Sequence, residues 1–259
     1  MDEDAERTLI FADMLGFENL TKEFRLRVIH HPPDKAGYQF SSTSEMSNRF
    51  NRFTRVLDTC VFENGLNGAL QAMLFSDCAF LEFGNSIRAA LAATALMRGF
   101  VKAKVPVRMG IGRGTFYPLK FSTEISGATV VARSLFVGTA VVYAHAAEQC
   151  GGKGIRIFVH PSVSGEIPLI QQRIKVIALG KPYRNASWEL DYLPDRRPAN
   201  DRHLEEAADR ELFEAVAEMK DPAAPMRVRR QYVETLKALN RMRQANGKPL
   251  INIRPKKRG

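Results

Sequence analysis

The chain has 259 residues, 45% of them hydrophobic and 25% charged, and a net charge of +10, an ordinary composition for a globular protein with a full core. Its apolar runs fall short of the roughly 20 residues that cross a bilayer, and its acidic start lacks the apolar stretch of a signal peptide. We therefore expect a cytoplasmic protein without an integral membrane segment. The three cysteines share no metal-binding spacing, which argues against a zinc site or a disulfide framework.

The first predicted element is a buried strand over residues 9–12 that ends at Asp13. A turn with Gly16 and Phe17 follows it and leads into a helix, whose free N-terminal N–H groups can receive a phosphate.

Apolar residues at helical spacing predict a second helix that contains Met46, Phe50, Phe53, Val56 and Leu57. Further along, Ser76 and Asp77 stand at the tip of a predicted hairpin. An Asp beside a strand is more often a turn former or a helix cap when it is taken alone. Two carboxylates that converge beside an anion-receptive helix, Asp13 and Asp77, instead favour Mg²⁺ or Mn²⁺ bound to a nucleoside triphosphate.

Four blocks in this order resemble the class III nucleotide cyclase domain, the family of adenylyl and guanylyl cyclases. The blocks are Phe11-Ala-Asp13-Met-Leu-Gly16-Phe17, Ser76-Asp77 with Phe83-Gly84, Arg108-Met-Gly110-Ile111-Gly-Arg-Gly114, and Gly138-Thr-Ala-Val141-Val142-Tyr-Ala144-His-Ala146-Ala-Glu148. Gly180-Lys181 and Trp188 follow as the family's final strand pair. The resemblance covers residues 7–193, and four ordered blocks are more specific than any one of them.

The resemblance implies an α+β fold with a ferredoxin-like βαββαβ class III cyclase core, and a homodimer with active sites at the shared interface. It also implies two Mn²⁺ or Mg²⁺ ions in each active site. The catalytic and metal-binding residues would be Asp13 and Asp77, with the carbonyl of Met14 as a further metal ligand. The triphosphate would contact Gly16, Phe17 and Lys181, although Lys181 can equally be an ordinary exposed loop residue.

The chain departs from the family at two positions of the last block. The family's transition-state Asn falls on Val142 and its phosphate-binding Arg falls on Ala146, and neither side chain can stabilise charge. Loss of such a group costs about two to three powers of ten in rate. Candidates for the missing cation are Arg113, Arg133 and Lys181. Arg49 and Arg52, on the second predicted helix, are candidates for contacting the base, or else lie on a solvated face.

The last block is most similar to the stand-alone bacterial cyclases of Pycsar antiphage systems, which make cyclic UMP or cyclic CMP. Adenylyl cyclases place a Lys and an Asp where this chain has Pro106 and Leu135. We therefore expect a cyclase that converts a pyrimidine nucleoside triphosphate, UTP favoured over CTP, to a 3′,5′-cyclic second messenger in antiphage defence. The alternatives are an adenylate or guanylate cyclase, and a catalytically weak pseudo-cyclase that binds nucleotide or a partner.

Two further helices are predicted at residues 204–219 and 228–242 by their apolar stripes. We divide the chain into a cyclase catalytic domain (7–193), a C-terminal helical pair (200–247) that packs on the core or on a dimer partner, and a basic tail (248–259).

The C-terminal segment carries the net charge. Eleven of the 38 Lys and Arg residues lie in residues 222–259, where Glu234 is the only acid. Such a segment can attract an anionic partner, but its only aromatic residue is Tyr232. We therefore favour a solvated end that does not bind nucleic acid specifically.

Overall fold

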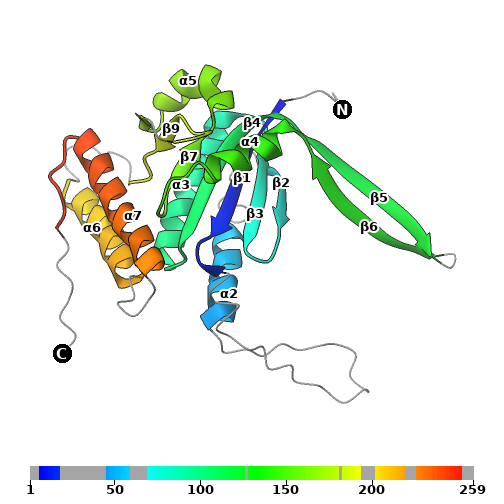
Figure 1. Ribbon diagram of the computed structural model, residues 1–259, viewed down its shortest axis with the longest axis horizontal. Helices are drawn as coiled ribbons and strands as arrows, with labels where there is room; N and C mark the ends of the chain where they lie inside the picture. Colours follow the sequence, from blue (N-terminus) through cyan, green and yellow to red (C-terminus); the bar gives the residue numbers. More distant parts are fainter. Residues whose placement is uncertain are drawn as a thin grey trace, which may run out of the picture.

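The computed structural model describes residues 6–17, 45–58, 69–125, 128–180, 183–193, 202–219 and 226–252 (Figure 1). Its elements are β1 (Glu6–Met14), α2 (Glu45–Asp58), β2 (Ala69–Leu74), β3 (Cys78–Phe83), α3 (Ser86–Lys102), β4 (Val107–Thr115), β5 (Tyr117–Ile125), β6 (Ala128–Val137), α4 (Thr139–Glu148), β7 (Ile157–Val159), the 3₁₀ helix η2 (Pro161–Glu166), α5 (Ile167–Gln171), β8 (Val176–Ala178), β9 (Trp188–Leu190), α6 (Arg202–Met219) and α7 (Met226–Ala245). None of the described helices is long and apolar enough to span a membrane.

The main sheet has seven strands in the order β2-β3-β1-β4-β7-β9-β8, with β1 antiparallel to both of its neighbours. Successive side chains of a strand point to opposite faces. In β1, Ile10 and Ala12 accordingly join the main core on one face, while Leu9 and Phe11 join a second apolar cluster on the other. This mixed sheet with helices confirms the predicted α+β class.

Helix α3 packs against the main-core face of the sheet, where it contacts β1 and β4. Asn85 caps its start by accepting a hydrogen bond from the backbone N–H of Arg88 at 2.9 Å. Its buried face contains several alanines, which allow the helix to lie close to the strands: Ala89, Ala90, Ala92 and Ala93. Helix α2, the predicted second helix, packs on α3, with the rings of Phe53 and Phe100 stacked at 5.1 Å.

Helix α4 lies on the other face, directly over β4, because β4 has glycine at alternate positions. A Cβ at Gly110 would stand 2.0 Å from the carbonyl oxygen of Ala144, and one at Gly112 would stand 2.4 Å from the backbone nitrogen of the same residue. These two glycines bring the helix backbone to the strand backbone. They are two of the glycines of the third cyclase-like block, so that block encodes the docking of α4.

The β5 and β6 strands form a separate two-stranded sheet, which projects from the body as a long arm (Figure 1). The arm begins where Tyr117 pairs with Val137. Helices α6 and α7 lie on the opposite side of the molecule from this arm (Figure 1).

The C-terminal helices share the main core with the sheet, so the predicted helical pair packs on its own chain. Leu212 and Val216 of α6 and Met242 of α7 belong to the same buried cluster as Ile10. The first residues of the predicted basic tail, which begins at residue 248, contact α7. Ile251 is buried, and its backbone N–H donates to Asn240 at 3.0 Å, so residues 248–252 pack as part of the folded chain.

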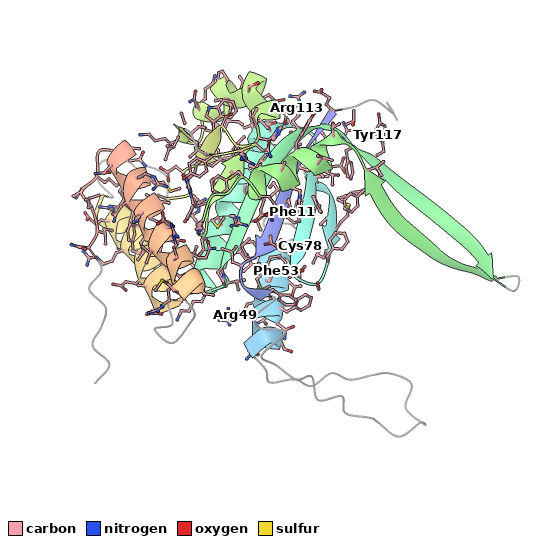
Figure 2. All side chains as sticks on the ribbon, in the orientation of Figure 1. Phe11, Arg49, Phe53, Cys78, Arg113 and Tyr117 are labelled. Carbon is pink, nitrogen blue, oxygen red and sulfur yellow. The ribbon has the colours of Figure 1, made fainter. Side chains whose placement is uncertain are left out.

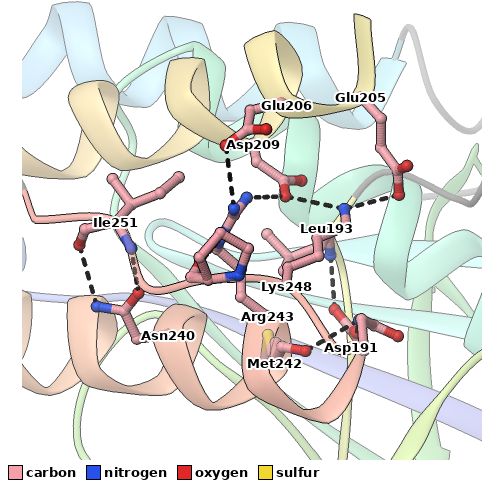
Figure 3. Close-up of polar contacts among 12 residues, drawn as sticks. Asp191, Leu193, Glu205, Glu206, Asp209, Asn240, Met242, Arg243, Lys248 and Ile251 are labelled. Atoms are coloured by element: carbon pink, nitrogen blue, oxygen red, sulfur yellow. Dashed lines mark hydrogen bonds and ion pairs between the residues drawn. The ribbon is translucent and has the colours of Figure 1, made fainter. Parts of the chain in front are cut away.

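A buried polar network joins α6, α7 and this C-terminal segment (Figure 3). The Arg243 guanidinium is 1% exposed and forms an ion pair with the fully buried Asp209, and its Nε donates to the carbonyl of Pro249 at 2.7 Å. Lys248 contacts Asp209 at 2.9 Å and Glu205 at 2.6 Å. A buried ion pair of this kind is costly to break from one side, because the remaining charge stays buried.

Replacing Arg243 by Ala is therefore expected to lower the free energy of unfolding by about 3 kcal/mol. Urea unfolding of the two proteins measures the difference. Arg230→Ala is the matched control, since Arg230 is an exposed arginine of the same helix, and it should change stability by less than about 0.5 kcal/mol. Equal small losses in both variants would contradict the assigned role of Arg243.

Candidate functional site

The structure brings Asp13 and Asp77 to the same end of the sheet, although 64 positions separate them in the chain. Asp13 is the penultimate residue of β1, and Asp77 lies in the turn between β2 and β3. The backbone N–H of Met14 donates to the carbonyl of Asp77 at 2.9 Å, which ties the turn to the end of β1. The turn is closed by the N–H of Phe75, which donates to the carbonyl of Cys78 at 2.8 Å.

Carboxylates crowd around Asp13. The pKa of Asp13 is raised to about 7, chiefly by burial and in addition by the nearby charges of Glu148 and Asp77, while Arg108 lowers it. The pKa of the Cys78 thiol rises to about 11 by burial and by the same acids. Cys78 lies directly opposite Asp13 in the register of β1 and β3. This end of the sheet therefore concentrates negative charge that a cation would relieve.

Arg108 and Glu148 form an ion pair beside this cluster. Glu148 ends α4 and is fully buried, and the guanidinium of Arg108 contacts it through both Nε and Nη2. The Nη1 of Arg108 donates to the carbonyl of Gly152 at 3.1 Å. Arg108 is also the β4 register partner of Asp13. Both residues occur in the cyclase-like blocks, but sequence reasoning assigned neither of them a role.

Asp13 and Asp77 fit a hard divalent cation, because carboxylate oxygens are its preferred ligands. Among the residues that the structure describes, no group of three or more His, Cys, Asp or Glu side chains has metal-binding geometry. Mg²⁺ is commonly held by only one or two carboxylates, with water and substrate phosphates completing its shell. The donor set therefore fits an ion that arrives with a phosphate ligand.

The charge crowding predicts that Asp13→Asn stabilises the metal-free protein. The pKa of Asp13 is raised on folding from 3.8 to about 7, so ionising this carboxylate is less favourable in the folded protein than in the unfolded chain. The free energy of unfolding of the wild type therefore falls as the pH rises through this window. The gain from Asp13→Asn should be about 2 kcal/mol larger at pH 8 than at pH 5.5. Urea unfolding in EDTA at both pH values measures it. A gain that does not grow with pH, or that grows equally for the exposed Asp58→Asn, would contradict it.

The turn after β1 contains the other predicted contact residues. Gly16 has φ +83°, a left-handed conformation that favours glycine, and the N–H of Leu15 donates to the carbonyl of Pro106 at 2.8 Å. The Met14 side chain is buried in the core, and Phe17 packs partly buried against the same core. The predicted phosphate-receiving helix after Phe17 lies outside the described residues.

The structure does not bring all predicted cations to Asp13 within one chain. Arg113 pairs in register with Thr8, about 17 Å along β4 from Arg108 at roughly 3.4 Å per residue. Its guanidinium is held by Glu6 and Glu166, and Figure 2 shows it on the far side of Phe11 from Cys78. Arg113 therefore belongs to the opposite end of the sheet from Asp13.

The remaining candidates have different positions. Arg52 on α2 donates to the carbonyl of Ala103, just past the end of α3, at 3.2 Å, which is a structural contact. Arg49 lies nearer than Arg52 to the N-terminal end of α2 (Figure 2). Arg133 belongs to β6 of the projecting arm, opposite Phe121. Lys181 lies outside the described residues.

The two departures from the family lie on α4. Val142 is 62% exposed and Ala146 is partly exposed, so this helix offers apolar groups where the family has an amide and a guanidinium. Two polar side chains lie between them. Tyr143 stacks its ring on His160, with centroids 4.4 Å apart, and the exposed His145 makes an edge-to-face contact with Phe11, with centroids 5.2 Å apart. The sequence analysis includes His145 in the fourth cyclase-like block but assigns it no role.

Neither a protein-family model nor a curated protein matches the chain. Solved structures do match it. The guanylate cyclase domain of RhGC from Catenaria anguillulae, in complex with GTP, is 14% identical with a TM-score of 0.53, covering 74% of this chain and 98% of that one. A dimeric guanylyl cyclase domain of the RhoGC fusion protein from Blastocladiella emersonii is 14% identical with a TM-score of 0.51, covering 72% and 94%.

An adenylate cyclase from Trypanosoma brucei in its monomeric state is 13% identical with a TM-score of 0.50, covering 75% of this chain and 93% of that one. At these identities the likeness concerns the fold. The fold expected from the four blocks, that of the adenylyl and guanylyl cyclase catalytic domains, is thus confirmed.

Proposed function

We propose that this protein is a nucleotide cyclase, a phosphorus-oxygen lyase that converts a nucleoside triphosphate to a 3′,5′-cyclic mononucleotide and pyrophosphate. The observation that carries the proposal is the meeting of Asp13 and Asp77 at one end of a cyclase-type sheet. The reaction forms a bond between the ribose 3′-oxygen and the α-phosphorus, and pyrophosphate leaves.

Asp13 and Asp77 would hold two Mn²⁺ or Mg²⁺ ions, with the carbonyl of Met14 as a further ligand. Bound there, the ions lower the pKa of the 3′-hydroxyl and neutralise the triphosphate. The backbone of Gly16 and Phe17 and the side chain of Lys181 are the proposed triphosphate contacts. The high pKa of Asp13 supports this assignment, because a site with excess negative charge is suited to a cation.

A homodimer is part of the proposal. The β5–β6 arm projects from the body and carries Arg133, which a second copy could receive (Figure 1). Large apolar side chains are exposed near the base of the arm and on the hairpin that contains Asp77, among them Phe75 and Val137. An arm with an apolar base suits pairing with an identical chain, and it would supply a cation in place of the groups lost at Val142 and Ala146.

We propose a pyrimidine substrate, with UTP favoured over CTP, and a product that acts as a second messenger in antiphage defence in the cytoplasm. Pro106 and Leu135 support this, because they cannot form the hydrogen bonds of an adenine-reading Lys and Asp. The second candidate is a purine cyclase. It is supported by the matching folds, whose proteins are guanylate and adenylate cyclases, one of them crystallised with GTP.

Incubation of the purified protein with Mn²⁺ and each of the four ribonucleoside triphosphates, followed by mass spectrometry, tests the proposal. Cyclic UMP or cyclic CMP supports it in full, and cyclic AMP or cyclic GMP supports the purine cyclase instead. Asp77→Asn is the control that should give no product. Absence of product from every triphosphate would contradict the proposed cyclase activity and favour a pseudo-cyclase that only binds nucleotide.

A further inference from the structure

We infer that helix α7 is a positioning element of the candidate active site, which acts by anchoring the loop of residues 150–156 that holds Arg108 beside Asp13. The inference rests on the proposed metal-binding role of Asp13. It gives the C-terminal helices a part in the site, although they lie on the opposite side of the molecule from the β5–β6 arm (Figure 1).

Two side chains of α7 accept hydrogen bonds from the backbone of this loop. The N–H of Gly154 donates to Oε1 of Gln231 at 2.6 Å, and the N–H of Ile155 donates to Oγ1 of Thr235 at 2.8 Å. The Thr235 hydroxyl uses its own proton within the helix, donating to the carbonyl of Gln231 at 2.8 Å. The Thr235 oxygen can therefore only accept a hydrogen bond from the loop, and the N–H of Ile155 is the donor.

The loop lies directly on the helix. Gly154 has φ +95°, and a Cβ there would stand 2.7 Å from Oγ1 and 2.9 Å from the backbone nitrogen of Thr235. Only glycine fits this conformation and this distance. The hydroxyl of Tyr192 donates to the carbonyl of Ile155 at 2.9 Å, so the loop is also held from the sheet side.

The other end of the loop holds Arg108. The backbone of Gly152 lies against the ring of Phe158, where a Cβ would stand 2.1 Å from a ring carbon, and its carbonyl accepts from Nη1 of Arg108. The other two bonds of the guanidinium go to Glu148. No ion pair between Arg108 and Asp13 occurs in the described part of the chain. The arginine is thus engaged elsewhere, and it leaves the Asp13 carboxylate to a metal ion.

Release of the loop would allow Arg108 to turn toward Asp13, its register partner, and to compete with the metal. The test is the affinity for Mn²⁺ alone, measured without nucleotide by electron paramagnetic resonance, in the double variant Gln231→Leu, Thr235→Val. We expect its Mn²⁺ dissociation constant to rise about fivefold, as the loss of one net hydrogen bond would produce. In turnover assays, the Mn²⁺ concentration for half-maximal activity should rise similarly, while kcat at saturating Mn²⁺ stays within about twofold of the wild type.

Two control variants separate positioning from general loss of stability. Thr94→Val removes a buried helical hydroxyl that donates only to Leu91 within its own helix, and it should leave Mn²⁺ affinity unchanged. Thr235→Ser, with Gln231 unchanged, keeps the hydroxyl acceptor and should have the Mn²⁺ affinity of the wild type. Unchanged Mn²⁺ affinity in the double variant, or an equal loss in Thr94→Val, would overturn the inference. The expected Mn²⁺ shift in a protein without turnover would support the positioning role and overturn only the proposed function.

Discussion

Replacing Asp13 or Asp77 by Ala is expected to lower turnover by more than about 1,000-fold, roughly 4 kcal/mol of transition-state stabilisation. Each substitution removes half of the carboxylate pair on which the proposed metal binding depends. The fold should remain intact, because Asp77 lies in a turn and Asp13 occupies a crowded position whose charge opposes folding. Initial rates at saturating Mn²⁺, with circular dichroism on the same samples, measure both effects.

The control for this prediction is Asp58→Ala, since Asp58 is exposed at the end of α2. Its turnover should equal that of the wild type. Wild-type turnover in either Asp13→Ala or Asp77→Ala would contradict the proposed metal-binding role of these acids. A circular dichroism spectrum of unfolded protein in those variants would instead mean that the two acids are needed for folding.

The largest effect on stability is expected from Gly110→Ala. The new Cβ would lie 2.0 Å from the carbonyl oxygen of Ala144 and 2.5 Å from the backbone nitrogen of Glu148. Both are backbone atoms that no side-chain rotation can move, so α4 has to leave the sheet. We expect a loss of more than about 4 kcal/mol in the free energy of unfolding, above the range typical of overpacking. Thermal unfolding monitored by circular dichroism measures it.

Gly165→Ala is the comparison variant, because a Cβ at Gly165 meets nothing within 4 Å. Its stability should stay within about 0.5 kcal/mol of the wild type. The glycines of β4 would have no packing role if Gly110→Ala unfolded at the wild-type temperature. Glu148, which ends α4 and pairs with Arg108, would also be displaced in the variant. Activity should therefore fall even at temperatures where the variant is folded.

The placement of Asp13 and Asp77 could be predicted because each lies in a short local pattern. A buried strand that ends at an acid, and a hairpin with an acid at its tip, are both formed by residues adjacent in sequence. The glycines of β4 were likewise visible as a motif. Their physical role is the contact between the β4 backbone and the backbone of α4, which becomes apparent only once both elements are placed.

The role of the arginines could not be predicted in the same way. Arg108 and Arg113 lie on one strand and belong to one motif, but the register of β4 against β1 puts the first opposite Asp13 and the second opposite Thr8. Register depends on the pairing of distant strands, and a strand's own sequence does not specify its neighbour. Arg113 was therefore a reasonable candidate by motif and is an ion-pair residue by position.

The sequence by itself determined the fold class, through the resemblance of four ordered blocks to the cyclase domain. It also determined the strand that ends at Asp13, the hairpin that carries Asp77 and the two C-terminal helices, because those depend on local periodicity and short motifs. Only the tertiary structure decided that Arg108 is held by Glu148 and Gly152, and that Gln231 and Thr235 of α7 anchor the loop leading to them. Those contacts join residues 40 to 80 positions apart through side-chain to backbone hydrogen bonds and a buried ion pair. No local pattern specifies such contacts, since they form only where packing brings a donor within about 3 Å of an acceptor.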